Sequence, residues 1–551
     1  MRFLREGQRL NQVEKWKLER HPLDVREAVL EVYSEEGVEA IERVPGEHER
    51  LKWVGIYPQN QGGNNFMQRI KVPGGRLTPE QARVIGRIAR DFARGPEPNP
   101  HFGNNFLDIT TRQDIQMHWI QIEEVPEIWR RLEEVGMTTV QACGDSARNV
   151  LCCPVSGLDR EEAFDAYPAA QAITAYFVGN REYANLPRKF KMSVTGCLED
   201  CAQAEINDIG MLPARLPDGT LGFNVRVGGG LGDGPRMASD IDVFVLPGEA
   251  VEITRGIAQV YGELGNRENR WINRLRYLVQ ELGPEGFREE LEKRVSIPLR
   301  PAGEDLTRRY RGDHVGVHPQ KESGLYYVGL NVPVGRMSGE QFEEAGRLAG
   351  EYGRDIRLAT DQNLIITGVP EGRLDDLLSE PLLRRYSPDP GPFERGIVAC
   401  TGSEFCRFAI VETKIRALEW AREMDRRFGD EIGQEAVRMH FSGCSASCAQ
   451  PQIADVGFRG ETAKKGDRIV EGVDIGLGGS LGRDAAFIDW VEGARPAEDV
   501  PEALSRVFER FRRERREGER FHEWARRVRN AELRDTLRGT SVPVVGTREG
   551  R

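Results

Sequence analysis

The sequence predicts a mixed α and β fold, of α+β and α/β character, that is built from two copies of one unit. Stretches with the alternating apolar pattern of strands are followed by stretches with the spacing of amphipathic helices, first after Val54 and again after Val315. Six motifs of the first half also return in the same order in the second half. We therefore expect an internally duplicated chain that folds around a pseudo-twofold axis.

The repeat can be followed along both halves. VGIYPQNQGG at residue 54 matches VGVHPQKESG at 315, KVPGGRLTPEQ matches NVPVGRMSGEQ, and DITTRQDIQ at 108 matches RLATDQNLI at 357. VTGCLEDCAQAEINDIGM matches FSGCSASCAQPQIADVGF at a separation of 247 residues, and VRVGGGLGDG matches IGLGGSLGRD. TTVQACGDSARN is aligned with GIVACTGSEFC, which pairs Cys143 with Cys400. These matches indicate a gene duplication.

The first repeated unit follows a charged N-terminal region. Residues 1–50 are predicted to form helices that wrap the body of the protein. Residues 51–130 are predicted to form strands, an amphipathic helix that starts near Thr78, one further strand over FLDITTRQDIQMHWIQI and a helix over VPEIWRRLEEVG. Residues 310–390 repeat this unit, and we expect the two units to build one joint domain.

A longer region follows each unit. Residues 131–309 and 391–551 carry the cysteine and glycine motifs, and each is predicted to form an α/β domain. Two or three amphipathic helices are expected within 250–300, and further helices within 499–530. The tail SVPVVGTREGR is expected to be mobile.

Composition limits the class of protein. The 551 residues exceed what one core supports, so two to four domains are expected. Apolar residues make up 39% and charged residues 30%, and no run of about eighteen apolar residues could span a bilayer. The N-terminus shows no signal-peptide core, and the net charge of −11 argues against nucleic acid as the main partner. We expect a cytoplasmic protein that binds neither membranes nor nucleic acids.

Nine cysteines fall in two windows of the chain. The second window holds two close pairs, Cys400 with Cys406 and Cys444 with Cys448. Thiolates are soft ligands, and four of them from two loops are the ligand set of an iron–sulfur cube. The alternatives are disulfides, a structural zinc site and buried inert thiols, although nothing indicates an oxidising compartment and the five-residue spacer is long for zinc.

The first window lacks one ligand of such a set. Its position facing Cys406 is Asn149, so a second cube of the same kind is not expected there. The aligned thiols of this window are Cys143, Cys197 and Cys201. We interpret them as buried relics of the duplication, and a different cluster that recruits Cys152 or Cys153 is the alternative.

Basic residues show the opposite bias between the halves. Five lie inside motif loops of the first half, and Lys191 alone aligns with another base, Arg438. The other four alignments are Arg69 with Gly329, Arg112 with Asp361, Arg148 with Phe405 and Lys189 with Ala436. The first half is therefore predicted to hold an anion and the second half a metal cluster. A solvated surface position is the alternative for any single base.

In these motifs the chain resembles the sirohaem-containing, ferredoxin-type sulfite and nitrite reductases. The motifs are CTGSEFC with GCSASCAQ, together with TTRQDIQMHW, GDSARNVLC, LPRKFK and LNQVEKWKLER, and the similarity extends over nearly the whole chain. The resemblance implies two ferredoxin-like half-units that form one joint domain, plus two α/β domains that carry the cofactors. It also implies one 4Fe–4S cube that is bridged to the iron of a sirohaem through a cysteine sulfur.

The resemblance implies roles for individual residues. The residues that match the cube ligands are Cys400, Cys406, Cys444 and Cys448, of which Cys448 matches the bridge to sirohaem. Sirohaem is a polycarboxylate, and the residues that match its binding shell are Arg112, Gln116, His118 and Asn149. Those that match the set for the substrate anion are Arg69, Arg148, Lys189 and Lys191.

The implied reaction is the six-electron reduction of a small oxyanion. In this family the second lysine of LPRKFK accompanies sulfite reduction and asparagine accompanies nitrite reduction, so Lys191 favours sulfite to sulfide, with nitrite to ammonia as the alternative. A weaker alternative is an electron carrier without reductase activity, which would not need the cationic residues. No nucleotide-binding GxGxxG pattern is apparent, so we expect electrons from another protein. The resemblance implies a ferredoxin as this donor, with a flavoprotein as the alternative, and we expect a monomeric enzyme.

Overall fold

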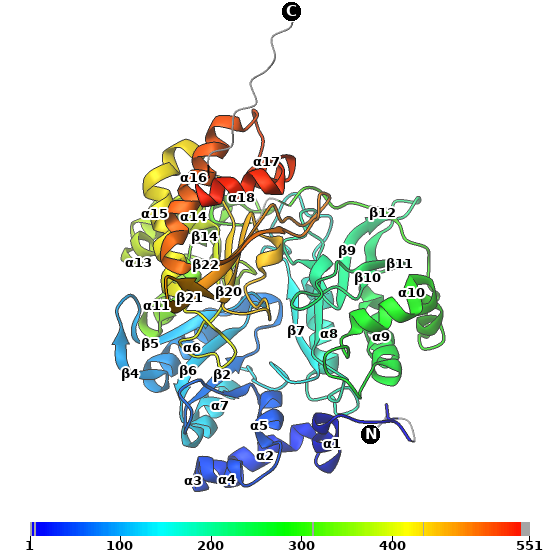
Figure 1. Cartoon of the computed structure of the whole chain (residues 1–551). Coiled ribbons are helices and arrows are strands. Elements are labelled where there is room, and N and C mark those ends of the chain that lie inside the picture. The colour runs from blue at the N-terminus through cyan, green and yellow to red at the C-terminus, as the bar shows by residue number, and fades with distance from the viewer. Residues whose placement is uncertain (1–2, 5–6, 311–312, 434, 541–551) are drawn as a thin grey trace, which may run out of the picture. The chain divides into compact units, whose positions relative to one another are not determined.

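A computed structural model describes residues 3–4, 7–310, 313–433 and 435–540 (Figure 1). The chain divides into two compact units, residues 1–389 and residues 390–551. The tail from 541 to 551, for which the sequence suggests mobility, lies outside the described residues.

Short helices form the first part of unit 1, as the sequence predicts. They are α1 (Gln12–Glu19), α2 (Val25–Ala28), α3 (Ser34–Glu36), α4 (Val38–Glu42) and α5 (Glu47–Arg50). The Asn11 side chain caps α1 by accepting hydrogen bonds from two backbone N–H groups. Buried Lys17 donates to Glu14 at 2.5 Å and to the Leu186 carbonyl at 3.0 Å, and Arg267 donates to Glu14 at 2.7 Å. These contacts fix α1 to the region around residues 186 and 267.

The first sheet has the order β1-β2-β6-β5-β15, and β4 pairs with β5. Its strands are β1 (Ile56–Pro58), β2 (Phe66–Ile70), β4 (Arg94–Asn99), β5 (Gly103–Ile109), β6 (Ile115–Ile120) and β15 (Arg336–Ser338). The prediction of one strand over FLDITTRQDIQMHWIQI is wrong, because this segment is the hairpin of β5 and β6. Thr110 N donates to Asp114 O at 2.9 Å and Gln113 has a φ of 56°, so the chain reverses within TTRQD.

The second sheet has the order β13-β14-β17-β16-β3. Its strands are β3 (Arg76–Leu77), β13 (Gly316–Pro319), β14 (Leu325–Leu330), β16 (Ile356–Leu358) and β17 (Leu364–Pro370). The two half-units exchange edge strands, since β3 of the first pairs with β16 of the second, and β15 of the second pairs with β5 of the first. The predicted joint domain is therefore confirmed.

A buried ion pair joins the exchanged strand β15 to its host sheet. Arg336 lies directly opposite Asp108 in the register of β15 and β5. Its Nε and Nη2 donate to the two carboxylate oxygens of Asp108 at 2.7 and 3.0 Å, and the arginine is fully buried. A slip in register would leave two buried charges unpaired, so the pair fixes the register of the exchange.

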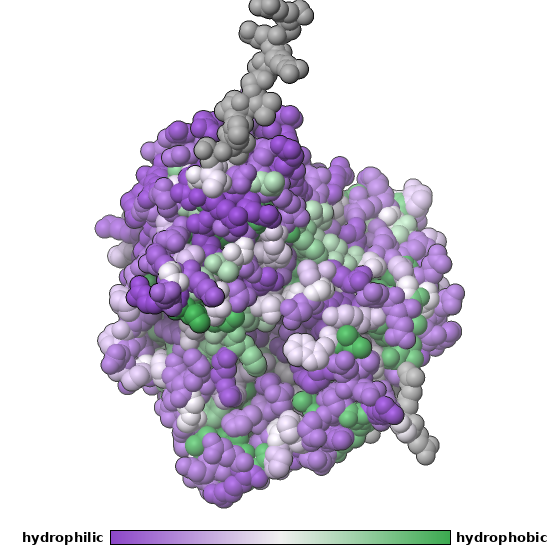
Figure 2. Space-filling view, in the orientation of Figure 1, coloured by the Kyte–Doolittle hydropathy of each residue, from purple (hydrophilic) through white to green (hydrophobic). Residues whose placement is uncertain are grey.

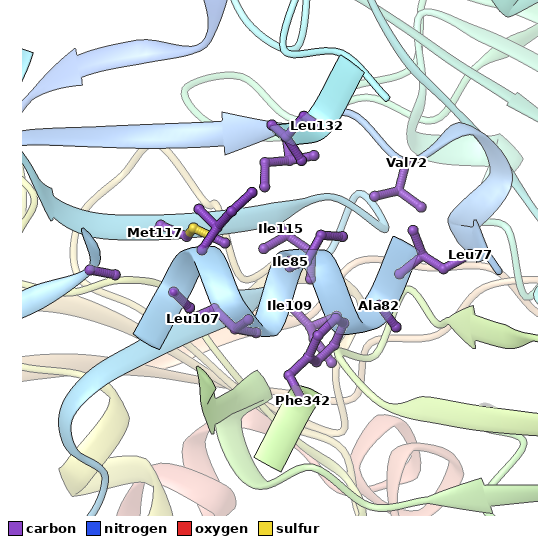
Figure 3. Close-up of a cluster of buried hydrophobic side chains, with 14 of the residues drawn as sticks. Val72, Leu77, Ala82, Ile85, Leu107, Ile109, Ile115, Met117, Leu132 and Phe342 are labelled. Atoms are coloured by element: carbon purple, nitrogen blue, oxygen red, sulfur yellow. The ribbon is translucent and has the colours of Figure 1, made fainter. Parts of the chain in front are cut away.

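Two equivalent helices pack against the joint domain, α6 (Pro79–Phe92) and α11 (Gly339–Tyr352). Each starts with a capping box, which confirms the predicted start near Thr78. Figure 3 shows the apolar core around α6, where Ile85 and Ala82 meet side chains of β5 and β6 and Phe342 of α11. The remaining helices of this region are α7 (Val125–Glu134), α12 (Leu374–Ser379) and α13 (Pro381–Arg385).

The third sheet of unit 1 has the order β11-β10-β9-β8-β7, and β12 pairs with β9. Its strands are β7 (Ala147–Cys152), β8 (Phe190–Val194), β9 (Ile209–Arg215), β10 (Leu221–Val227), β11 (Ser239–Val245) and β12 (Glu304–Asp305). Strands β7, β8 and β9 are parallel, whereas β10 and β11 are antiparallel additions. The helices that follow in this part of the chain are α8 (Tyr167–Phe177), α9 (Ala250–Leu264) and α10 (Leu275–Glu292), so the helices predicted within 250–300 are confirmed.

Unit 2 repeats this topology with the order β18-β19-β20-β21-β22. Its strands are β18 (Ile397–Ala399), β19 (Met439–Ser442), β20 (Val456–Lys465), β21 (Arg468–Leu477) and β22 (Asp489–Pro496). Again the first three strands are parallel and the last two antiparallel. The helices of unit 2 are α14 (Pro392–Arg395), α15 (Lys414–Ile432), α16 (Val500–Glu514), α17 (Phe521–Arg527) and α18 (Asn530–Arg538).

The strand registers give a second, independent alignment of the repeat. Val150 lies opposite Met192 in β7 and β8, and Ile397 lies opposite Met439 in β18 and β19. Met192 and Met439 are equivalent at the 247-residue separation, so the same separation must apply to the ends of β7 and β18. The structural counterpart of Cys400 is therefore Cys153.

This register corrects part of the sequence alignment. Cys143 precedes β7 and is not the counterpart of Cys400, and Asn149 lies inside β7, whereas Cys406 lies beyond the end of β18. The alignment of Arg148 with Phe405 is wrong for the same reason. At the 247-residue separation, Asp159 stands in the place of Cys406.

The surface reflects the composition. Figure 2 shows a face that is mostly hydrophilic, with apolar residues in small separate areas. None of the helices in the described part of the chain combines the length and the apolar character that a bilayer crossing requires.

The contact of α6 with α11 depends on glycine. A methyl group on Gly86 would lie 2.5 Å from Glu343 N and 2.6 Å from the carbonyl oxygen of Gly339. We expect Gly86→Ala to lower the free energy of unfolding by about 1–3 kcal/mol, despite the better helix propensity of alanine. The control is Gly286→Ala in α10, whose methyl group would meet only Leu282 at 3.6 Å. Thermal unfolding followed by circular dichroism should show a lower midpoint for Gly86→Ala alone, and equal losses would contradict this packing argument.

Candidate active site

Four basic residues of unit 1 lie close together. Arg69 is on β2, Lys71 directly follows this strand, Arg112 is in the turn between β5 and β6, and Arg148 is on β7. Their charges affect one another: Arg148 and Arg69 both lower the pKa of Arg112, and Arg148 and Arg112 lower that of Lys71. Lys189, another predicted anion ligand, directly precedes β8. The structure thus groups three of the predicted basic residues with Lys71.

Burial raises the free-energy cost of holding these positive charges together when no anion is bound. Burial lowers the pKa of Lys71 to about 8 and the pKa of Arg112 to about 9. Asp114 lies among the cations, and burial raises its pKa to about 6 although Arg69, Arg112 and Lys71 act to lower it. Burial thus destabilises the ionised form of Asp114, so this one carboxyl group offsets only part of the buried positive charge. The arrangement therefore favours the binding of an anion.

Two buried polar atoms beside these cations also indicate a ligand. Arg112 donates to Asn207 Oδ1 at 2.9 Å and to the Asn149 carbonyl at 2.6 Å, but its Nε has no hydrogen-bond partner within the described chain. Asn149 Nδ2 donates to the carbonyls of Val72 and Arg112 at 2.7 and 3.0 Å, and its Oδ1 also lacks a partner among the described residues. Buried polar groups are normally paired, so Arg112 Nε can donate to a carboxylate of a carboxyl-rich macrocycle, whereas Asn149 Oδ1 requires a donor such as a water molecule.

The two other residues predicted for the sirohaem shell lie on β6. Gln116 is directly opposite Arg69 in the register of β2 and β6, and so it shares the face of the sheet with Arg69. His118 contacts protein groups: its Nε2 lies 3.4 Å from Asp108 Oδ2, and its Nδ1 lies 3.2 Å from Gln59 Oε1. His118 therefore belongs to the ion cluster that joins β5 to β15.

The ion pair beside Lys191 differs from the ion pair that its counterpart in unit 2, Arg438, forms. In unit 1, Arg274 binds both carboxylate oxygens of Asp208 at 3.0 and 2.9 Å, and Lys191 contributes its backbone N–H to Asp208 at 2.8 Å. In unit 2, the counterpart Arg438 itself binds the equivalent Asp455 through Nε and Nη2, both at 3.0 Å. The aspartate of unit 1 is thus neutralised by an arginine from another segment.

The glycine motifs VGGGLGDG and LGGSLG serve the packing of the protein itself. A methyl group on Gly229 would lie 2.6 Å from the carbonyl oxygens of both Asn207 and Glu205. A methyl group on Gly479 would lie 2.6 Å from the carbonyl oxygen of Gln452. These glycines therefore allow a close approach between backbone segments.

The four predicted cube cysteines lie in loops at one edge of the sheet in unit 2. Cys400 follows β18 and Cys444 follows β19, and these parallel strands present their carboxyl ends at the same edge. Gly443 N donates to Cys400 Sγ at 3.2 Å, which links the two loops. Burial raises the pKa of Cys400 to about 12, and the nearby Cys448 and Cys406 add to this effect. Thiols from both loops are therefore close enough to interact.

A different group of thiols lies in unit 1. Among the described residues, one group of possible metal ligands has all its ligand atoms within 4.8 Å of one another. It consists of Cys153, Cys197 and Cys201, and all three are buried. Hydrogen bonds from the other two thiols lower the pKa of Cys197. Cys152 is part of the apolar core instead. The first window thus contains a compact trio with Cys153, the residue that takes the place of Cys400.

Sequence reasoning missed Lys71 and Tyr57. Residues two apart on a strand share a face, so the position of Lys71 two residues after Arg69 is a signal that could have identified it. Burial raises the pKa of Tyr57, as does the neighbouring Cys143, whereas Arg148 and Arg69 act to lower it. Tyr57 thus stands beside the basic group, but its sequence context gives no comparable signal.

Thiols gathered at a sheet edge and buried cations with unpaired polar atoms are features of a metal-containing oxidoreductase that binds anionic groups. The family model of the nitrite and sulphite reductase 4Fe-4S domain matches residues 143–299 and 391–541. The model of the nitrite/sulfite reductase ferredoxin-like half domain matches residues 57–135 and 318–383. The chain belongs to the nitrite and sulfite reductase family.

Relatives match over almost their full length. The chain is 44% identical to the assimilatory ferredoxin-dependent nitrite reductase of Haloferax mediterranei, covering 93% of this chain and 90% of that protein. It is 40% identical to the ferredoxin–nitrite reductase of Synechococcus elongatus, covering 92% and 97%. A solved structure of the Mycobacterium tuberculosis NirA protein superimposes with a TM-score of 0.88 at 33% identity, covering 96% of this chain and 98% of that one.

Membership of this family defines the prosthetic groups, which are sirohaem and a 4Fe–4S cluster. The unpaired Nε of Arg112 and the buried cations around it fit a polycarboxylate macrocycle. The thiols that follow β18 and β19 fit a cluster with soft ligands. The predicted cofactors are therefore consistent with the residues that the structure brings together in each unit.

Removal of a thiol in unit 2 should remove the cluster. We expect Cys400→Ala to reduce acid-labile sulfide from about four per chain to nearly none, because inorganic sulfide belongs to the cube and sirohaem contains none. Cys152→Ala is the control, since it deletes a thiol from the apolar core of unit 1. Sulfide assays on both purified variants test this, and an unchanged sulfide content in Cys400→Ala would show that Cys400 is not a ligand.

Proposed function

We propose that this protein reduces nitrite to ammonia in a six-electron reaction, with electrons supplied by a ferredoxin. The observation that carries the proposal is the buried basic group of unit 1, since an electron carrier has no need of an anion site. The choice of nitrite and of ferredoxin rests on the relatives from Haloferax mediterranei and Synechococcus elongatus, which are named ferredoxin-dependent nitrite reductases. Bound sirohaem would supply the iron at which the anion is reduced.

The residues of unit 1 have two tasks in this proposal. Arg112, with Gln116 on the adjoining strand face, holds carboxylates of the macrocycle, and Asn149 borders the same site with an Oδ1 atom that can accept a hydrogen bond. Arg69, Arg148, Lys189 and Lys191 attract and orient the substrate anion. Lys71 joins this second group, because a buried ammonium with a pKa of about 8 is charged at neutral pH and can also give up a proton. Such fixed cations stabilise charge on the substrate oxygens.

The residues of unit 2 hold the cluster. Cys400, Cys406, Cys444 and Cys448 are its proposed ligands. Cys448 is exposed, whereas the other three are half-buried. An exposed sulfur can be shared with a group that lies outside the loop, and this supports Cys448 as the proposed link between cluster and sirohaem.

Sulfite is the second candidate substrate, and Lys191 is the observation that favours it. Sulfite carries more negative charge than nitrite and has three oxygens, so an additional ammonium group stabilises it more strongly. Arg274 already neutralises Asp208, so the charge of Lys191 is not required for that carboxylate. The relatives named as nitrite reductases nevertheless give the stronger argument for nitrite.

Turnover with reduced ferredoxin distinguishes the two substrates. We expect kcat/KM for nitrite to exceed that for sulfite by at least tenfold, and Lys191→Asn to lower the value for sulfite more than the value for nitrite, because the dianion loses more Coulomb energy. Lys293→Asn is the control, since Lys293 is an exposed lysine paired with Glu290 at 2.6 Å. A wild-type preference for sulfite would reverse the choice of substrate, and absence of both activities in protein loaded with both cofactors would exclude the reductase.

Anion binding should weaken at alkaline pH through Lys71. Its pKa is lowered from 10.5 to about 8, so the ammonium group is present below pH 8 and is lost as the pH rises above it. We expect the Kd of the holoenzyme for nitrite to rise about three- to tenfold between pH 7.5 and 9.5. Lys71→Arg keeps a cation over this range and should flatten the rise, which spectral titration can measure. An equal pH dependence in both proteins would rule out Lys71 as the titrating group.

A further inference from the structure

We propose that Cys153, Cys197, Cys201 and His314 bind one tetrahedrally coordinated metal ion of the zinc class in unit 1, separate from the 4Fe–4S cluster. The sulfur atoms of the three cysteines all lie within 4.8 Å of one another. The Nε2 of His314 lies 3.8 Å from Cys153 Sγ. Three thiolates and one imidazole form a common ligand set of structural zinc.

The spacing of the ligand atoms favours a single ion over a cube. With Zn–S bonds of about 2.3 Å and Zn–N bonds of about 2.0 Å, a tetrahedral site places its sulfurs about 3.8 Å apart and sulfur and nitrogen about 3.5 Å apart. The trio fits the sulfur–sulfur separation, and the distance from His314 Nε2 to Cys153 Sγ is close to the sulfur–nitrogen separation. His314 is not within 4.8 Å of all three sulfurs, so its imidazole must move closer to the trio when the metal binds. In a cube each cysteine binds a different iron, so its sulfurs must stand farther apart. The compact geometry of unit 1 therefore suits one ion.

The strand registers explain how such a site could arise. Cys153, Cys197 and Cys201 each stand 247 residues before a cysteine of unit 2, so they occupy three of the four equivalent ligand positions. The fourth position holds Asp159 in place of a thiol. Here the imidazole of His314, from the segment that precedes β13, approaches the sulfur of Cys153 instead. Loss of one thiol and gain of a histidine would convert a cube site into a zinc site.

The surroundings of the trio also suit a bound metal. Cys153, Cys197 and Cys201 are 1%, 3% and 5% exposed, so water has little access and no open coordination position is needed. Glu199 N donates to Cys197 Sγ at 3.4 Å, a contact of the kind that stabilises metal thiolates. Thr360 Oγ1 donates to the Cys201 carbonyl at 2.8 Å and holds the loop in place. The ion would thus be structural and would tie the ends of β7 and β8 to the second half-unit.

Metal analysis of holoenzyme made without a polyhistidine tag tests the proposal. We expect about one zinc per chain together with about four acid-labile sulfides. Cys197→Ala should lose the zinc and keep the sulfide, Cys400→Ala should keep the zinc and lose the sulfide, and Cys152→Ala should keep both. X-ray absorption at the zinc edge of the wild type should show three sulfur neighbours and one nitrogen, which tests the site even if Cys197→Ala does not fold.

Three results would overturn the proposal. The first is wild-type protein that contains no zinc after incubation with zinc chloride and a thiol reductant. The second is about eight acid-labile sulfides per chain, which would mean a second cube in unit 1. The third is zinc that remains at the wild-type level in folded Cys197→Ala. None of these results depends on the choice between nitrite and sulfite.

Discussion

The parallel pairing of β7 with β8, and of β18 with β19, is the constraint on which both proposed metal-ligand sets depend. Parallel neighbours end at the same edge of their sheet, so the loops that follow them lie side by side although about 40 residues separate them in the chain. Each loop pair therefore needs few residues to bring thiols together. The sheet supplies the rigid frame, and the loops supply the chemistry.

Duplication of this frame allowed the two copies to diverge without a change of fold. Unit 2 keeps four thiols, whereas unit 1 has Asp159 in place of the fourth and gathers basic side chains at a different place. The aspartate beside the second strand is retained in both units, but it is neutralised by Arg438 in one and by Arg274 in the other. Charge balance was thus preserved by different segments, which allows the equivalent positions to take different tasks.

Local sequence patterns predicted much of this structure, but they failed where residues that are distant in the sequence come together. The helix after Thr78 and the joint domain follow from capping residues and from repeated motifs, which are local information. The hairpin around Arg112 was missed because its apolar alternation continues across a short turn. Matching motif letters pair Cys143 with Cys400, whereas the strand registers place Cys153, ten residues later in the chain, at the position of Cys400. No spacing rule brings His314 to Cys153.

The exchange of edge strands also sets an order of events during synthesis. Arg76 of β3 lies opposite Arg357 of β16 in the strand register. Strand β3 of the first half-unit therefore cannot pair until the second half-unit has left the ribosome. Until then the nascent chain exposes unpaired sheet edges, which favour aggregation and engage chaperones. Assembly of the joint domain therefore cannot finish before β16 has been synthesised.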